Sequence, residues 1–261
     1  MADAITATTN ARVKEIVSLR KRRERDRTGL FVIEGARELK RATDANIELI
    51  EVFSCDELAS PITRTLLSAV DSTAMSEKAF AKCSYRDRSD GVIAIARQFD
   101  TALGSFHPPP DSVLLALEAI EKPGNLGTMM RTALAAGAAG VICADPATDV
   151  FNPNVVRASL GALFAVPLVV TDTTTAIDWL TEKGFGIYST TPAGDTEPWS
   201  VDFTSGAAVV VGSESSGLSL PWLDGASALV RIPMADRADS INAAMAAGVM
   251  LFEAARQRAK T

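Results

Sequence analysis

Residues 113–131 read Val-Leu-Leu-Ala-Leu-Glu-Ala-Ile-Glu-Lys-Pro-Gly-Asn-Leu-Gly-Thr-Met-Met-Arg. An apolar run that ends in Pro-Gly-Asn and continues into a segment rich in Gly, Ala, Leu and Met predicts a buried strand, a tight turn and a helix. We expect Asn125 to cap that helix and Arg131 to lie on it. A guanidinium beside an apolar wall needs an anion, either a phosphate or an internal carboxylate.

The same alternation of apolar runs and helical patterns continues to the C-terminus. We expect strands at 113–117, 140–143, 166–170, 186–189, 208–211 and 229–232, and helices at 129–136, 155–163, 175–182 and 241–258. Alternation of this kind predicts an α/β fold with a parallel sheet covered on both faces. Ligands of such sheets bind beyond the carboxyl ends of the strands.

A smaller α/β unit is expected before this domain. Its pattern predicts a helix at 10–26, strands at 30–33, 49–53 and 92–96, and helices around 36–42, 62–70 and 76–82. The stretch 99–112 lacks apolar periodicity and contains three prolines, so we place the linker there. The expected domains are therefore 1–105 and 106–261.

Positive charge is concentrated near the N-terminus, although the whole chain carries a formal charge of −6. Residues 1–105 hold 17 Lys and Arg against 16 Asp and Glu, whereas residues 106–261 hold 9 against 16. The basic segment contains Arg20, Arg22, Arg23, Arg25 and Arg27. Such a segment can neutralise nucleic-acid phosphates whatever the global charge. A solvated helix face with internal ion pairs remains the alternative.

Several classes of protein are disfavoured by what the sequence lacks. No apolar run approaches the roughly 20 residues that span a bilayer, and the N-terminus has no signal-peptide pattern, so a cytoplasmic location is expected. Cys55, Cys83 and Cys143 have no metal-ligand spacing and are expected to be reduced core thiols. The single histidine, His107, lies beside three prolines and is a poor base or ligand. No metal is expected.

Two later segments also combine glycine with polar side chains at expected strand ends. Residues 209–218 read Val-Val-Val-Gly-Ser-Glu-Ser-Ser-Gly-Leu, where Gly212 permits close backbone approach to a ligand and Glu214 suits donors. Residues 232–242 run from Ile-Pro-Met-Ala to Ser-Ile-Asn, where we expect Ser240 to cap the last helix and Asn242 to face a ligand or partner. A plain strand–helix turn and a tightly packed terminal helix are the alternatives.

Together these segments resemble, in the same order, the three motifs of the SpoU/TrmH family of RNA ribose methyltransferases in the SPOUT superfamily. The motifs are Asn-x-Gly-x-x-x-Arg at 125–131, Gly-x-Glu-x-x-Gly-Leu at 212–218, and Ile-Pro-Met with Ser-Ile-Asn at 232–242. The chain departs from the usual motifs at Ser213 and Ser215, where Asn and Gly are common, and at Ile241, where Leu is common. Residues 10–42 resemble the ribosomal-protein-like substrate-binding domain of many members.

The resemblance implies a SPOUT domain with a trefoil knot, a homodimer, and methylation of a ribose 2′-hydroxyl in a structured RNA by S-adenosylmethionine. Ribosomal RNA is favoured over transfer RNA. The implied catalytic residues are Arg131, Asn125, Glu214, Ser240 and Asn242. The implied cofactor-binding residues are Gly212, Ile232, Ile241, Thr190, Pro233, Met234 and Ala235. Arg20, Arg22, Arg23, Arg25 and Arg27 would hold the RNA backbone.

Three other functions are compatible with parts of this pattern. A member of the same superfamily could methylate a base instead of a ribose. An RNA-binding ribosome-assembly factor could keep the fold with little or no activity. A generic nucleotide-binding enzyme is disfavoured, because the chain has neither Gly-x-Gly-x-x-Gly nor Gly-Lys-Ser/Thr.

Overall fold

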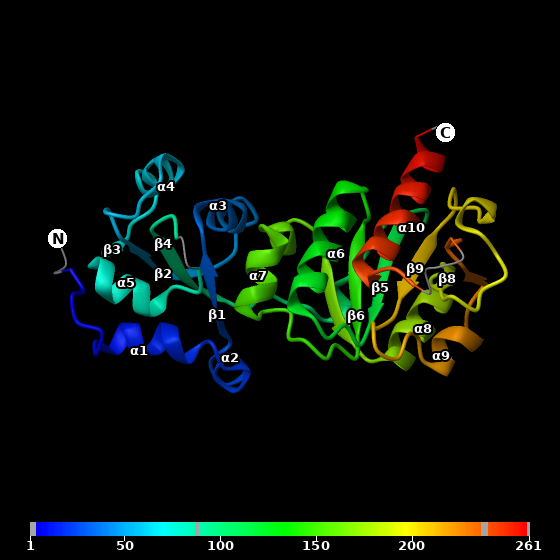
Figure 1. Ribbon diagram of the computed structural model, residues 1–261, viewed down its shortest axis with the longest axis horizontal. Helices are drawn as coiled ribbons and strands as arrows, with labels where there is room; N and C mark the ends of the chain where they lie inside the picture. Colours follow the sequence, from blue (N-terminus) through cyan, green and yellow to red (C-terminus); the bar gives the residue numbers. More distant parts are fainter. Residues whose placement is uncertain (1–3, 87–88, 236–239, 260–261) are drawn as a thin grey trace. The chain divides into compact units, whose positions relative to one another are not determined.

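A computed structural model describes residues 4–86, 89–235 and 240–259 (Figure 1). The chain forms two compact units, each described by itself below. The first unit comprises Met1–Phe99 and Asp149–Ala165, and the second comprises Asp100–Thr148 and Val166–Thr261. The expected linker is close to the first crossing between the units. The segment Asp149–Ala165 differs from expectation, because it packs with the first unit although it lies within the expected second domain.

The first unit is a four-stranded mixed sheet with helices on both sides. Its strands, in sheet order, are β1 (Leu30–Glu34), β4 (Val92–Arg97), β2 (Leu49–Ser54) and β3 (Thr73–Ala74). Its helices are α1 (Ala11–Ser18), α2 (Arg22–Thr28), α3 (Ala36–Asp44), α4 (Pro61–Leu67), α5 (Glu77–Cys83) and α7 (Pro153–Ser159). Val32 and Ile95 join residues of α1 and α5 in one core cluster. The two-residue strand β3 has too short a pattern to be predicted.

The helix expected over residues 10–26 is wrong, since it is broken into α1 and α2. Leu19 ends α1 with its side chain fully buried, which turns the chain toward the core. The break leaves carbonyl groups without helical partners. The guanidinium of Arg25 satisfies two of them, because its Nη1 donates to the carbonyl oxygens of Leu19 at 2.8 Å and Arg20 at 3.0 Å.

Arg25 also fastens the inserted segment to the first unit. Its side chain is 1% exposed, and its Nε donates to Oδ2 of Asp149 at 2.8 Å. Beside this ion pair, Phe151 lies 5.1 Å from Phe31 and 5.0 Å from Phe99, measured between ring centroids. A charged pair and an aromatic cluster therefore explain why 149–165 packs here. Arg25 is consequently a wrong member of the expected RNA-binding set, because no phosphate can reach it.

The second unit contains the parallel sheet that the sequence predicts. Its strands, in sheet order, are β10 (Ala228–Val230), β8 (Gly186–Thr190), β9 (Ala207–Val211), β5 (Val113–Glu118), β6 (Gly140–Ala144) and β7 (Leu168–Thr171). Every pairing in this sheet is parallel. The carboxyl ends of β8, β9 and β5 lie side by side, since Thr190 is in register with Val211, and Val211 with Leu117. The trefoil knot stays a prediction.

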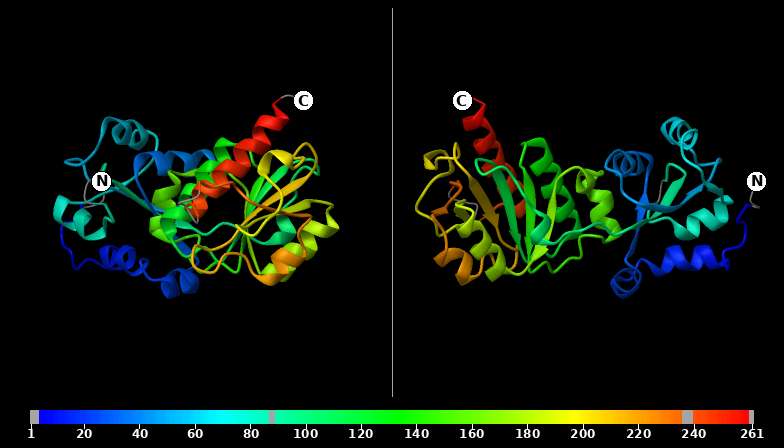
Figure 2. Two further views of the ribbon diagram at one scale, coloured as in Figure 1. Left: turned by 45° about the vertical axis from the view of Figure 1, so that its right-hand side comes forward. Right: turned by 180° about the vertical axis from the view of Figure 1, so that it is seen from behind.

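Helices cover both faces of this sheet. The long helices α6 (Pro123–Ala135) and α10 (Ala243–Arg258) pack against each other and lie side by side in Figures 1 and 2. The other face is covered by α8 (Thr173–Glu182) and by α9 (Leu220–Asp224), whose Trp222 is fully buried. The helix α9 was not predicted, because five residues are too few to show a helical period.

Two expected helix caps are wrong. Helix α6 begins at Pro123 with Lys122 as its N-cap, because proline at the first helical position needs no N–H partner. Asn125 thus lies inside the first turn, where its amide is free for other contacts. Helix α10 begins one residue after Asn242, whose Oδ1 accepts a hydrogen bond from the backbone N–H of Ala244 at 2.9 Å. Asn242 is therefore the cap in place of Ser240.

The three cysteines are free and buried, as expected. Burial raises the pKa of the Cys143 thiol to about 12, which keeps it protonated at neutral pH. Within the described ranges, no helix has both the length and the apolar character that a membrane crossing requires. The described side chains also include no group of three or more His, Cys, Asp or Glu residues that could hold a metal ion.

Replacing Arg25 tests whether the inserted segment depends on the buried ion pair. Arg25→Met should lower the free energy of unfolding by about 3–5 kcal/mol, because Asp149 is left without its partner. Urea denaturation of the whole chain would measure the loss. The matched control is Arg22→Met, because Arg22 pairs with Asp26 on the exposed face of α2. Loss of this exposed pair should lower the free energy of unfolding by less than about 1 kcal/mol. Equal small losses in both variants would contradict the structural role of Arg25.

Candidate functional site

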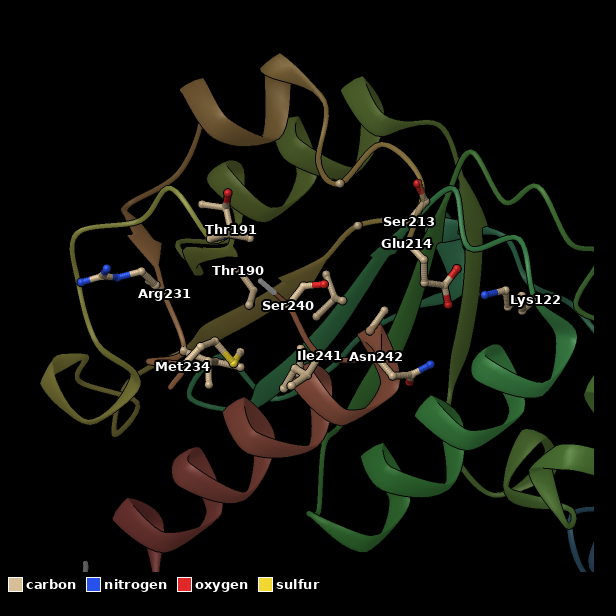
Figure 3. A pocket seen from close by; sticks show the side chains of 17 residues that line it. Lys122, Thr190, Thr191, Ser213, Glu214, Arg231, Met234, Ser240, Ile241 and Asn242 are labelled. Carbon is tan, nitrogen blue, oxygen red and sulfur yellow. The ribbon is translucent and has the colours of Figure 1, made fainter. Parts of the chain in front are cut away.

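A pocket of about 650 Å³ opens where β8, β9 and β10 end (Figure 3). Its wall is formed by the loops that follow these three strands and by the start of α10. The lining residues are Lys122, Thr190, Thr191, Pro192, Val211, Gly212, Ser213, Glu214, Gly217, Arg231, Ile232, Met234, Ser240, Ile241, Asn242, Ala243 and Ala246. The position agrees with the general rule for ligands of parallel sheets.

The loop after β9 folds tightly back on itself. A Cβ atom added at Gly212 would lie 2.3 Å from both the carbonyl carbon and the oxygen of Gly217, so only glycine fits there. Gly217 has a φ of +67°, which glycine adopts without strain, and its N–H donates to the carbonyl of Ser213 at 3.1 Å. The loop therefore brings bare backbone to the wall of the pocket.

A buried carboxylate holds the end of this loop in place. Glu118, at the carboxyl end of β5, accepts hydrogen bonds from the N–H of Ser219 at 2.7 Å and from its hydroxyl at 2.5 Å. Thr173, at the start of α8, donates to the same carboxylate at 3.1 Å. Glu118 is 6% exposed, so these three bonds are shielded from water. The loop from Gly212 to Ser219 is thereby tied to the central strand.

A chain of side-chain hydrogen bonds joins the three sequence segments at one end of the pocket. The amide Nδ2 of Asn242 donates to Oδ1 of Asn125 at 3.3 Å, and Nδ2 of Asn125 donates to Oε1 of Glu214. The other carboxylate oxygen, Oε2 of Glu214, is buried and has no hydrogen-bond partner among the described residues. Glu214 is therefore held on one side and free to accept a donor on the other.

Another part of the pocket has an apolar wall. Ile232, Met234 and Ile241 contribute apolar side chains, and Thr190 ends β8 with a buried Oγ1 that has no partner in the described part of the chain. An apolar wall with a few converging polar groups is typical of a pocket for a small organic molecule. The unpaired oxygens of Thr190 and Glu214 are positions where a ligand would supply the missing donors.

Most of the expected pocket residues line this cavity. Gly212, Ile232, Ile241, Thr190 and Met234 do so, as do Glu214, Ser240 and Asn242, whereas Pro233 and Ala235 do not. Asn125 reaches the pocket only through its bonds to Glu214 and Asn242. Further lining residues were not predicted from the sequence; they end or follow a strand or lie in the first turn of α10, namely Lys122, Thr191, Pro192, Val211, Ser213, Gly217, Arg231, Ala243 and Ala246. For most of them, a position at or just after the end of a predicted strand was the signal that could have identified them.

Arg131 does not line the pocket of its own chain. It lies six residues after Asn125 on α6, which places it about 120° away around the helix axis. Its side chain is exposed, and no hydrogen bond or ion pair joins it to any other described residue. Among the carboxylates that the structure describes, neither Glu214 nor any other pairs with it. The guanidinium is therefore available to an anion from outside the chain.

The basic segment of the first unit is partly used for internal contacts. Arg27 pairs with Glu24 at 2.9 Å. An internal ion pair of this kind was expected if the basic segment is a solvated helix face. Arg20 donates to the carbonyl of Ser84 at 2.9 Å and lies 4.7 Å from the centroid of the Tyr85 ring. Arg22 and Arg23 remain exposed. The accessible positive charge of this segment therefore comes mainly from α2.

Comparison with known proteins gives matches over both units. Residues 112–252 match the SpoU rRNA methylase family, and residues 10–94 match the MRM3-like substrate binding domain. The 23S rRNA (uridine(2479)-2′-O)-methyltransferase of Streptomyces viridochromogenes is 31% identical over 91% of this chain and 86% of its own.

Solved structures are similar over nearly the whole chain. A crystal structure of an RNA 2′-O ribose methyltransferase has a TM-score of 0.89 and 37% identity, covering 98% of this chain and all of its own. An AdoMet-bound rRNA methyltransferase from Sinorhizobium meliloti has a TM-score of 0.88 and 33% identity, covering 97% of each chain. The similarity therefore includes both the small unit and the unit that carries the pocket.

Alanine should be tolerated at Gly124 in α6 but not at Gly212 in the tight loop after β9. Gly212→Ala should lower the free energy of unfolding by about 1–3 kcal/mol, because the new methyl group meets the backbone of Gly217. Gly124→Ala is the control, since a Cβ at this position in α6 meets nothing within 4 Å and should be neutral or slightly stabilising. Chemical denaturation would measure both. A neutral Gly212→Ala would mean that the loop is looser than described.

Proposed function

The chain belongs to the SpoU rRNA methylase family, and we propose that it transfers a methyl group from S-adenosylmethionine to a ribose 2′-hydroxyl of a structured RNA. The observation that carries this proposal is the convergence of three family-like segments on one pocket, joined by the bonds between Asn242, Asn125 and Glu214. Ribosomal RNA is favoured over transfer RNA, because relatives similar over most of their length are named as rRNA methyltransferases. A cytoplasmic location agrees with such a substrate.

The pocket fits S-adenosylmethionine in its chemistry. The adenosine portion suits the apolar wall of Ile232, Met234 and Ile241 together with the backbone at Gly212. Pro233 and Ala235 are proposed as neighbours of the cofactor because they adjoin Met234 in the sequence. The unpaired oxygens of Thr190 and Glu214 accept donors that such a molecule carries. When bound, S-adenosylmethionine supplies a methyl group on a positively charged sulfur, from which it is displaced in line by an oxygen nucleophile.

The protein must orient the 2′-hydroxyl and help it to lose its proton. A guanidinium with an intrinsic pKa above about 12 stays charged at neutral pH, so Arg131 is a poor general base. Its fixed charge instead stabilises the developing alkoxide and holds the adjacent phosphate, which can take the proton. Ser240 and Asn242 orient the nucleotide from the start of α10, while Asn125 keeps Glu214 in position.

Arg131 acts in the pocket of a second copy of the chain in this proposal. The support is that Arg131 is exposed, unpaired among the described residues and absent from the pocket of its own chain. The neighbouring helix α10 exposes an apolar stripe of Met245 (63%), Val249 (40%) and Phe252 (53%), spaced as on one helix face. An exposed stripe of this kind favours burial against a partner, so we propose a homodimer built on α6 and α10.

Arg131→Ala tests whether Arg131 is catalytic and whether the chain methylates RNA. Methylation of total ribosomal RNA should fall at least 100-fold, because the developing alkoxide loses its cation, whereas affinity for S-adenosylhomocysteine should change less than threefold. Nucleoside mapping of the product would show whether the methyl group is on a ribose or on a base. Arg231→Ala is not a suitable control because it lines the pocket, so Arg64→Ala in the first unit serves instead. If the wild-type chain binds RNA but transfers no methyl group, the alternative function of a ribosome-assembly factor is favoured.

RNA contacts are proposed for Arg20, Arg22, Arg23 and Arg27 on the first unit. Arg22→Gln combined with Arg23→Gln should weaken RNA binding about 10-fold at low salt and reduce its salt dependence, because two phosphate contacts are lost. Fluorescence anisotropy at several salt concentrations would measure this. Lys40→Gln is the control, since Lys40 is an exposed cation of the first unit that lies on α3, outside the basic segment. If the salt dependence of RNA affinity is the same in the double variant as in the wild type, Arg22 and Arg23 are not part of the RNA-binding surface.

A further inference from the structure

One end of the pocket holds two opposite charges that do not pair with each other. Lys122, the N-cap residue of α6, lines the pocket together with Glu214, and Figure 3 shows its ammonium group directed toward the Glu214 carboxylate. No ion pair within 4.0 Å joins Lys122 to any carboxylate in the described ranges. Glu214 is likewise without a cationic partner there.

The separation of these charges follows from how Glu214 is held. Its Oε1 accepts the amide of Asn125, which in turn accepts the amide of Asn242, so the carboxylate cannot swing freely toward Lys122. Its Oε2 remains buried without a donor. A buried acceptor without a partner is costly, and a ligand cation would relieve that cost. The space between the two side chains therefore favours a ligand group that carries both charges.

We propose that Lys122 and Glu214 clamp the zwitterionic α-amino acid end of the cofactor. Lys122 binds the α-carboxylate, and Glu214 binds the α-ammonium group through Oε2. This inference rests on the proposed function, because it concerns the same pocket. It adds Lys122 as a residue that selects ligands carrying an intact amino acid end, such as S-adenosylmethionine and S-adenosylhomocysteine, over shortened adenosine thioethers.

The second cation of the pocket, Arg231, lies in a different place. It follows β10, and Figure 3 shows its side chain extending away from Glu214 on the far side of the pocket. The ammonium and carboxylate groups of an α-amino acid are attached to the same carbon atom, so they cannot bind Glu214 and Arg231 together from opposite sides of the pocket. Arg231 therefore provides an internal comparison for the experiment.

The test is calorimetric binding of two ligands to the full chain in the absence of RNA. S-adenosylhomocysteine carries the amino acid end, and 5′-methylthioadenosine lacks it. Lys122→Met should weaken S-adenosylhomocysteine binding about 10- to 100-fold, the value of one charge-assisted contact, and change 5′-methylthioadenosine binding less than twofold. Lys183→Met, on the surface at the end of α8, should alter neither affinity. Unchanged 5′-methylthioadenosine binding also shows that the variant is folded.

Each other outcome has a distinct meaning. If Lys122→Met binds S-adenosylhomocysteine as tightly as the wild type does, the clamp is wrong while the proposed function stands. If Arg231→Met is the variant that loses S-adenosylhomocysteine selectively, the carboxylate lies at the opposite end and the clamp is equally wrong. If the wild-type chain binds neither ligand, the proposed function itself fails.

Discussion

The hydrogen bonds from Asn242 to Asn125 and from Asn125 to Glu214 are the constraint on which the pocket depends. They join side chains that are 117 and 89 residues apart in the sequence and that come from the start of α10, the first turn of α6 and the loop after β9. The strands beneath are fixed by their backbone ladder, but the loops beyond them have no such ladder. Side-chain bonds such as these, and those of Glu118 to the loop after β9, convert a rigid sheet edge into a pocket of defined shape.

The fold of the second unit could be predicted because its strands are buried on both faces. Runs such as Val113–Leu117 and Val209–Val211 are continuously apolar, and their alternation with helices allows few topologies. The site could be predicted in outline because polar residues follow those runs. The role of Asn125 could not, because local preference makes it a helix cap, and only folding brings Glu214 close enough to take its amide.

Arg25 shows a second limit of prediction from sequence. Within a run of basic residues it has the same local signal as Arg22 or Arg23, yet it alone is buried and paired with Asp149. The partner is 124 residues away, and nothing near either residue marks the pairing. Charge also divides unevenly along the chain, since residues 106–261 carry seven more acidic than basic residues. RNA affinity must therefore come from a few well-placed cations and not from the overall field.

The position of Asp149–Ala165 has a consequence for how the chain folds as it is synthesised. Domains generally fold as units in the order in which they leave the ribosome. Here the first unit lacks α7, the partner of Arg25 and two rings of its aromatic cluster until residue 165 has emerged. By that time β5 and β6 have also been made. The first unit therefore cannot complete its fold until two strands of the second unit have been synthesised.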